Sequence, residues 1–163
     1  MKVFDTAYFD KLVAEAQVNP RRRQHRNIHE SYGEPCQRLF NAIEPSSYIR
    51  PHRHISEPRE ELLIAVRGVM ALVTFDNLGE VRQVVRFGLD KLGAYSNREL
   101  AVGAEVPAGT WHTVVALQSG CVLFEVKAGP FDSDRAKDMA PWAPEEGSPA
   151  AGVYLNRLIE AVS

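Results

Sequence analysis

Three histidines and one glutamate form the pattern in this sequence with the clearest chemistry. His52 and His54 stand two residues apart, Glu61 follows shortly after them, and His112 comes just behind a Pro-Ala-Gly turn. Imidazole suits zinc, copper, iron and nickel, and a carboxylate extends the range toward manganese. The four side chains therefore predict a site for one divalent transition metal, such as iron, zinc, nickel or manganese. Open coordination positions on that metal would permit Lewis-acid or oxygen chemistry.

Strand geometry explains how these residues could meet. Side chains two residues apart project from the same face of a strand, so an extended segment 49–54 would place His52 and His54 side by side. Residues 55–60 contain a proline and three charges and predict a turn. A hairpin of this kind would bring Glu61, at the start of the next strand, back against the histidine pair.

The middle of the chain is typical of a protein built from short strands. Runs rich in Val, Leu, Ile and Phe alternate with turns, and Gly68 is expected to close one of them. Many short strands at close spacing favour a sandwich or barrel. The expected strands cover residues 36–43, 61–66, 70–75, 81–87, 112–117 and 121–126.

Helices are predicted at both ends of the chain. Phe4–Gln17 is amphipathic, can be capped by Asp5 or Thr6, and is ended by Asn19-Pro20. The polar stretch from there to Pro35 is expected to be irregular. The apolar stripe of the first helix is Phe9, Leu12, Val13 and Ala16, and that of a short C-terminal helix is Leu155, Leu158, Ile159 and Val162.

Composition excludes several classes of function. The 163 residues are 45% hydrophobic and 25% charged with a net charge of −2, which gives no global attraction to nucleic acid or to a membrane surface. The first twenty residues lack the apolar core of a signal peptide, and no stretch reaches the ~20 apolar residues of a membrane span. We therefore expect a cytoplasmic protein. Cys36 and Cys121 lie in apolar runs and are expected to be buried free thiols.

Polar residues near the predicted site have two interpretations each. The basic run 21–23 is either a solvated loop or an anion clamp near the mouth of the barrel. His25, Asn27 and His29 either line the entrance to the site or lie on a surface loop. His29 is also a candidate catalytic residue.

Three further side chains are candidates by strand parity. Tyr48 and Arg50 share the parity of His52, so Tyr48 could be a general acid and Arg50 could bind a phosphate or carboxylate, although Tyr48 could equally serve packing. Arg38 is a further candidate for substrate binding if it faces inward, where it would need an anionic partner. An outward Arg38 would only cover the surface.

The ligand pattern resembles the cupin superfamily. Six residues separate Glu61 from Gly68, and Pro107, Gly109 and His112 fit the second cupin motif. The resemblance implies a β-barrel with His52, His54, Glu61 and His112 around one metal. The chain departs from the motifs in a longer gap between His54 and Glu61, and at Ser46, Ala101 and Ala116.

The wider sequence is similar to the WbuC-type cupin metalloproteins over Phe4–Leu158. That resemblance implies one cupin-type double-stranded β-helix (a jelly-roll barrel) with short terminal helices, and a homodimer is expected from pairing of barrel edges. We expect one domain over 1–163, comprising an arm at 1–35, a barrel at 36–128 and a tail at 129–163. The words that carry the similarity are RQHRNIHESYGEPCQRLFNAI, RPHRH, GTWHTVVAL, FEVKAGPFD and APWAPEEGSP.

Three functions are compatible with this pattern. The first is a metal-dependent enzyme, isomerase-like or epimerase-like, acting on an anionic or sugar-derived small molecule. The WbuC-type resemblance implies a link to polysaccharide biosynthesis for it. The second is an Fe(II)-dependent dioxygenase, and the third is a non-enzymatic sensor or carrier of a small molecule.

Overall fold

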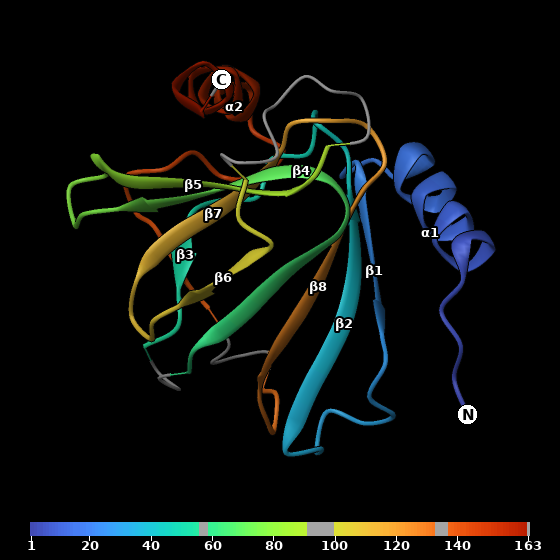
Figure 1. Cartoon of the computed structure of the whole chain (residues 1–163). Helices are drawn as coiled ribbons and strands as arrows, with labels where there is room; N and C mark the ends of the chain where they lie inside the picture. The colour runs from blue at the N-terminus through green and yellow to red at the C-terminus, as the bar shows by residue number, and fades with distance from the viewer. Residues whose placement is uncertain (56–58, 91–99, 133–136, 163) are drawn as a thin grey trace.

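The computed structural model describes residues 1–55, 59–90, 100–132 and 137–162 and shows a curled antiparallel sheet with a helix at each end of the chain (Figure 1). The expected mainly-β class is thereby confirmed. In the described residues the order along the sheet is β1-β2-β8-β4-β7-β3-β9, with β5 and β6 also paired to β4. The elements are α1 (Thr6–Val18), β1 (Arg23–Asn27), β2 (Cys36–Ile43), β3 (His52–Arg53), β4 (Glu61–Phe75), β5 (Val81–Leu89), β6 (Gly103–Val106), β7 (Trp111–Ala116), β8 (Cys121–Ala128), β9 (Asp138–Met139) and α2 (Pro149–Val162).

Strand β4 is the strand around which the barrel is organised, because it pairs with four other described strands. Its first half pairs with β6 and β8, and its second half pairs with β5 and β7. The expectation that Gly68 ends a strand is wrong, because β4 runs through it. Gly68 takes a φ of 74°, next to a register shift between Ala65 and Arg67. A glycine at positive φ lets the chain bend without ending the strand, so one strand can serve both halves of the curled sheet.

The polar stretch expected to be irregular contains strand β1. Arg23 to Asn27 pair with Ile43 to Leu39 of β2. A polar cavity is lined by Arg23, Gln24, His25 and Asn27 of this strand. The strand therefore lacks the apolar alternation by which a half-buried strand is predicted. Strand β1 therefore extends the sheet beyond β2.

Helix α1 closes the outer face of β2 and β8. The predicted stripe is confirmed, since Phe9, Leu12, Val13 and Ala16 are all buried, against Phe40 and Val122 among others. Asp5 is the N-cap, and its side chain accepts a hydrogen bond from the backbone N–H of Tyr8 at 2.9 Å.

Helix α2 covers the outer face of β7 and of the second half of β4. Leu155, Leu158 and Val162 are buried there, and Ile159 is partly buried against the same cluster. The predicted C-terminal stripe is therefore confirmed. Between the helices, a third cluster that includes Leu63, Leu123 and Val114 fills the inside of the sheet.

The two cysteines differ in environment. Cys121 is buried, which raises the pKa of its thiol to about 11. Cys36 is exposed, so the expectation that both thiols are buried is wrong for it. Cys36 is the first residue of β2, where the strand is only beginning to be covered.

Some expectations fall partly outside the described residues. The turn predicted at 55–60 includes residues 56–58, which are not described.

None of the helices in the described parts of the chain combines the length and apolar character that crossing a membrane requires.

Candidate metal centre

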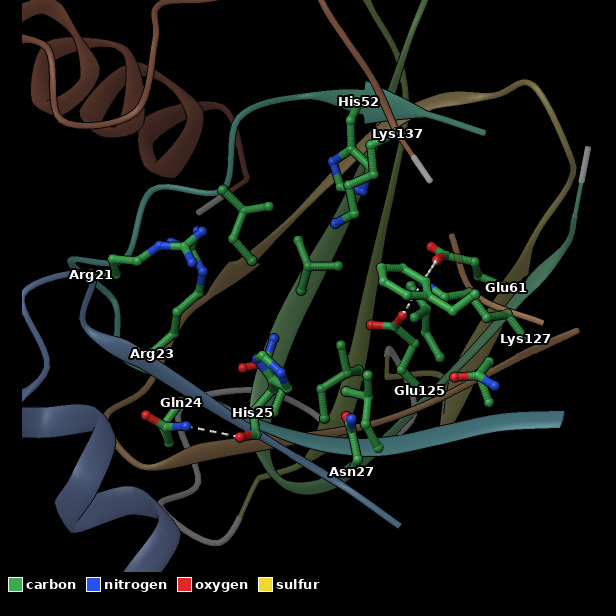
Figure 2. A pocket seen from close by; sticks show the side chains of 18 of the residues that line it. Arg21, Arg23, Gln24, His25, Asn27, His52, Glu61, Glu125, Lys127 and Lys137 are labelled. Carbon is green, nitrogen blue, oxygen red and sulfur yellow. Dashed lines mark hydrogen bonds and ion pairs between the residues drawn. The ribbon is translucent and has the colours of Figure 1, made fainter. Parts of the chain in front are cut away.

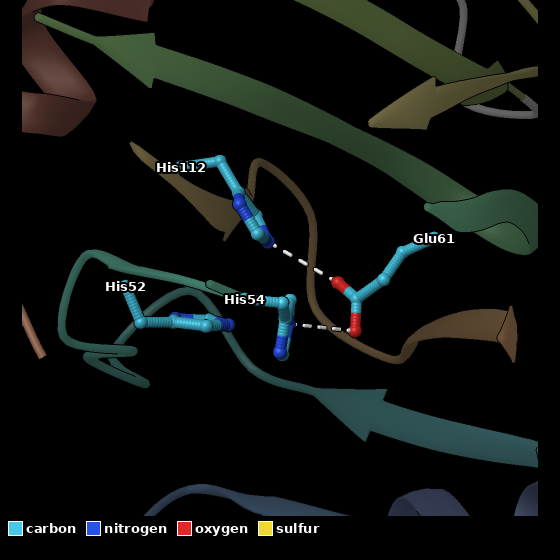
Figure 3. A group of neighbouring side chains, drawn as sticks. All are labelled: His52, His54, Glu61 and His112. Carbon is cyan, nitrogen blue, oxygen red and sulfur yellow. Dashed lines mark hydrogen bonds and ion pairs between the residues drawn. The ribbon is translucent and has the colours of Figure 1, made fainter. Parts of the chain in front are cut away.

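Four buried side chains converge inside the barrel (Figure 3). They are those of His52, His54, Glu61 and His112, and each offers a ligand atom within 4.8 Å of the others. The structure thus brings together the four residues whose types and spacing predict a metal site. Their role as ligands remains a prediction.

The sheet places each member of this cluster by strand register. His52 in β3 lies directly opposite His112 in β7, and the two ring centroids are 4.6 Å apart. His54 follows two residues after His52, with ring centroids 5.5 Å apart. Its carbonyl accepts a hydrogen bond from the N–H of Gly109, in the turn before His112, at 3.1 Å. Glu61 begins β4 and faces the histidines across the cluster.

Backbone carbonyls set the tautomers of two histidines. Nδ1 of His52 lies 3.0 Å from the carbonyl of Arg50, and Nδ1 of His112 lies 2.8 Å from that of Thr110. A carbonyl can only accept, so each Nδ1 carries the proton and donates it. The Nε2 lone pairs then face the centre, as in metal-binding histidines. Burial also lowers the pKa of His52 well below its ordinary value, which keeps its imidazole neutral.

Glu61 is held as an anion at the centre. Its Oε1 lies 3.0 Å from Nε2 of His54 and 3.0 Å from Nζ of Lys127, and its Oε2 lies 3.2 Å from Nε2 of His112. Burial alone would raise the pKa of Glu61. The contacts with the two histidines and the charge of Lys127 instead hold it well below its ordinary value.

These contacts fit a bound cation. With the proton of His112 on Nδ1, its Nε2 and the Oε2 of Glu61 are both acceptors, and a metal ion bound by both would satisfy them. Two ligands of one metal with bonds of about 2.1 Å are themselves about 3 Å apart. The donor set and its spacing therefore suit a divalent transition metal.

A cavity of about 410 Å³ extends from this centre across the inner face of the sheet (Figure 2). Strand alternation selects its walls, because residues in register on neighbouring strands share a face. Gln37 of β2, Lys127 of β8 and Glu61 of β4 form one such row. In the next row, Asn27, Leu39, Glu125 and Leu63 are in register across β1, β2, β8 and β4.

Two polar members of these rows escaped sequence reasoning. Glu125 and Lys127 line the cavity, and Nζ of Lys127 lies 2.9 Å from the Glu125 carboxylate. The segment 121–126 looks like an apolar strand because its polar residues come late. The signal available was parity, since Glu125 and Lys127 share the face of Leu123.

The predicted candidates divide between two environments. Asn27 and His29 line the cavity, which favours the site interpretation over the surface-loop one, and His25 lines it as well. Arg38 instead pairs with Glu34 at 3.0 Å, consistent with the outward interpretation.

Tyr48 and Arg50 are not among the residues that line this cavity. The Tyr48 hydroxyl donates to the carbonyl of Pro144 at 2.9 Å, and burial raises the pKa of this hydroxyl. Its ring packs in the cluster beneath α2. Arg50 donates to the carbonyl of Ala140 at 2.8 Å. Both side chains therefore hold the C-terminal tail in this structure.

The basic run at 21–23 already binds a carboxylate of this chain. Arg21 Nε lies 2.7 Å from Oε1 of Glu146, and a terminal nitrogen of Arg23 lies 2.7 Å from Oε2. Burial alone would raise the pKa of Glu146, but these hydrogen bonds lower it to about 2. The contact fastens the tail to β1 beside the cavity.

Replacing Glu146 with glutamine should remove a pH-dependent part of the stability. A carboxylate whose pKa is depressed by folding contributes above its unfolded pKa of about 4.5 and loses that contribution as the pH falls through about 2. Because the Glu146 side chain is partly exposed, we expect only about 1 kcal/mol near neutral pH. Thermal unfolding should show a difference in Tm between wild type and Glu146→Gln at pH 7. That difference should disappear as the pH falls from about 4.5 to about 2. An equal difference at every pH, or the same effect from the exposed neighbour in Glu145→Gln, would contradict this assignment.

Comparison with known sequences gives one match. The family described as "Domain of unknown function (DUF6016)" matches residues 4–87. Among curated proteins, none matches the chain.

Solved structures share the fold at low sequence identity. Protein SO0799 from Shewanella oneidensis is 15% identical with a TM-score of 0.55, and the match covers 85% of each chain. Rru_A2000 from Rhodospirillum rubrum, described as a cupin-2 domain, is 11% identical with a TM-score of 0.51, over 84% of this chain and 80% of that one. Oxalate decarboxylase from Bacillus subtilis is 15% identical with a TM-score of 0.52, over 86% of this chain but 32% of that one. The cupin fold is thereby confirmed, while the WbuC-type assignment remains a prediction.

Proposed function

This chain belongs to the family described as Domain of unknown function (DUF6016), and we propose that it is a metal-dependent enzyme acting on a small, anionic, sugar-derived molecule. One observation carries the proposal. Four buried residues offer donor atoms within 4.8 Å of one another, and three of them, His52, Glu61 and His112, line a cavity large enough for a small metabolite. The WbuC-type resemblance supports a place in polysaccharide biosynthesis, which forms part of the proposal.

The charges around the cavity favour an anionic ligand. Lys127 and Lys137 line it beside the metal centre, and the arginines paired with Glu146 line its other side. Lys137 projects near His52 in Figure 2 and makes no hydrogen bond to a described residue. Its ammonium group is therefore available to bind a carboxylate or phosphate next to the metal.

The chain's own residues suggest how such a site would work. A bound metal would supply Lewis-acid polarisation of a substrate carbonyl or hydroxyl group. Lys127 neutralises Glu61 and Glu125 at once, at 3.0 and 2.9 Å, and so fixes both carboxylates. Among the described cavity residues, Glu125 is the carboxylate outside the four-residue cluster. It would accept the proton that an isomerase-like or epimerase-like step removes.

Elemental analysis tests this proposal first. Tag-free protein purified without added metal or chelator should contain close to one transition metal per chain by inductively coupled plasma mass spectrometry. Zinc, nickel or manganese would direct a turnover screen to sugar acids and sugar phosphates. Iron would direct it to oxygen-consumption assays and the dioxygenase alternative. Protein that holds no metal and takes up none on titration would contradict the proposal, and tight ligand binding without turnover would favour the sensor or carrier.

A further inference from the structure

The cavity has a second polar wall, on β1 and β2, away from the metal centre. It presents the amides of Gln37 and Asn41 and the imidazole of His29, whereas Glu125 and Lys127 stand beside Glu61. His29, Gln37 and Asn41 each carry a buried polar atom without a hydrogen-bond partner in the described structure. Buried polar atoms are nearly always paired, so three on one wall require an explanation.

Gln37 presents an acceptor whose orientation is settled. Its Nε2 donates to the carbonyls of Tyr32 and Glu34, at 3.2 and 2.9 Å. Both amide hydrogens are therefore used, and the oxygen must be the atom that lacks a partner. The side chain is only 2% exposed, so this acceptor needs a donor that reaches it inside the protein.

His29 is constrained in the same way. Its Nδ1 lies 3.0 Å from the N–H and 2.9 Å from the carbonyl of Arg38, which pins the ring at the end of β1. The residue is 6% exposed, and its Nε2 lacks a partner. Nε2 can donate or accept according to which group of Arg38 Nδ1 engages. A hydroxyl group, which both donates and accepts, suits either state.

Asn41 extends the wall along β2. It lies four residues from Gln37, on the same face, so the two are about 13 Å apart along the strand. Its Oδ1 is a further polar atom without a partner. A six-carbon ligand that contacts both Gln37 and the metal centre is too short to reach Asn41 as well.

The distance to the metal centre limits the size of the ligand. Gln37, Lys127 and Glu61 are in register across three neighbouring strands, so Gln37 and Glu61 lie about 10 Å apart at the backbone. A two-carbon acid held at the metal centre is too short to contact His29 or Gln37. A chain of about six carbons can reach from one wall to the other.

We propose that His29 and Gln37 form a hydroxyl-binding subsite for a polyhydroxylated acid of monosaccharide size. Its acid group faces the metal centre and Lys137, and its distal hydroxyls donate to Gln37 and pair with His29. This inference rests on the proposed function for the acid end only. The subsite itself is defined by the unpaired atoms of Gln37, on β2, and His29, just after β1.

A matched pair of probes separates the two ends. D-gluconate is a six-carbon polyhydroxylated acid, and glycolate reproduces only its carboxyl and first hydroxyl carbons. By calorimetry, metal-loaded wild type should bind gluconate at least about tenfold more tightly than glycolate, since one buried hydrogen bond is worth roughly that factor. His29→Asn should weaken gluconate about tenfold and leave glycolate unchanged.

Asn41→Leu is a matched control inside the same cavity. The side chains have similar shape, and Asn41 makes no side-chain hydrogen bond to a described residue that the change would break. Removing an unpaired buried acceptor should leave the thermal stability of ligand-free protein unchanged or higher. Because Asn41 lies beyond the reach of gluconate held at the metal centre, the affinities for both acids should stay unchanged.

His29→Asn tests the subsite directly. Asparagine keeps a polar atom near the position of Nδ1 for the Arg38 backbone and removes the atom at Nε2. It should reduce gluconate affinity about tenfold without changing the glycolate affinity. Glu30→Gln, at the exposed neighbouring residue, is the control and should change neither.

Wild-type protein supplies a measurement that does not depend on a variant's folding. In zinc-loaded protein with labelled histidine, gluconate but not glycolate should shift the His29 imidazole signals, which His29→Asn identifies. Equal affinity for the two acids, an absence of gluconate binding, or an unmoved His29 signal would overturn the subsite and leave ordered water as the partner of these atoms. Metal content is measured on every sample, so a wild type without metal would contradict the proposed function, and a metal-loaded wild type with these results would contradict the subsite alone.

Discussion

His112→Ala should reduce the metal content from close to one per chain to almost none. Even the partners that orient a metal ligand change affinity by about 10–100-fold, so the loss of a direct ligand should cost at least that much. The change also leaves Oε2 of Glu61 without the Nε2 contact that it has at 3.2 Å. Elemental analysis of the variant beside wild type gives the result directly, and His52→Ala should behave alike.

Thermal unfolding separates the loss of metal from the loss of the fold. A metal that binds only folded protein raises Tm with its concentration. Added metal should raise the Tm of wild type and leave that of His112→Ala unchanged. His25→Ala is the matched control, because His25 lines the same cavity but lies outside the cluster, and it should retain one metal per chain. A double variant of His52 and His112 that still bound one metal per chain would refute the ligand assignment.

Gly88→Ala should destabilise the barrel by about 3 kcal/mol or more. Gly88 of β5 pairs with Val69, next to the bend in β4 at Gly68. Its φ is 139°, a conformation that residues with a side chain rarely adopt. A Cβ there would lie 2.1 Å from the carbonyl oxygen of Gly68 and 3.0 Å from the Cα of Val69. Backbone atoms on both sides cannot move aside, so the strands must separate. In thermal unfolding we expect a Tm lower by about 6–12 °C.

Gly152→Ala is the matched control for the same chemical change. Gly152 lies in helix α2, and nothing is within 4 Å of the position of its Cβ. Alanine in a helix should therefore stabilise the protein by about 0.5–1 kcal/mol. If both variants had the same Tm, the crowding at Gly88 would not restrict the barrel.

Local periodicity was sufficient for the helices and for most strands. The stripe Phe9, Leu12, Val13 and Ala16 predicts the buried face of α1 because a helix repeats every 3.6 residues whatever its surroundings. Strand β2 was predicted with the observed ends, Cys36 and Ile43. These elements bury apolar side chains against a core, and that requirement is visible in a single segment.

The metal centre was also accessible, for a related reason. His52 and His54 share a face through the period of two, and the turn before His112 is marked by its own proline and glycine. The residue types supplied the remaining evidence, because three imidazoles and a carboxylate together are typical ligands of a transition metal. The ligand set could therefore be proposed without knowledge of which strands pair.

Tertiary structure decided everything that depends on pairing between distant segments. Strand β1 has no apolar alternation because its inner face meets a polar cavity, so only its partner β2 identifies it as a strand. Lys127 holds Glu61 because β8 and β4 are in register. The arginines at 21 and 23 meet Glu146 from more than a hundred residues away. Short-range patterns record which side of a strand is buried. Register and strand order instead arise from the free energy of the whole packed barrel. Contacts between distant segments leave no periodic signal in the chain.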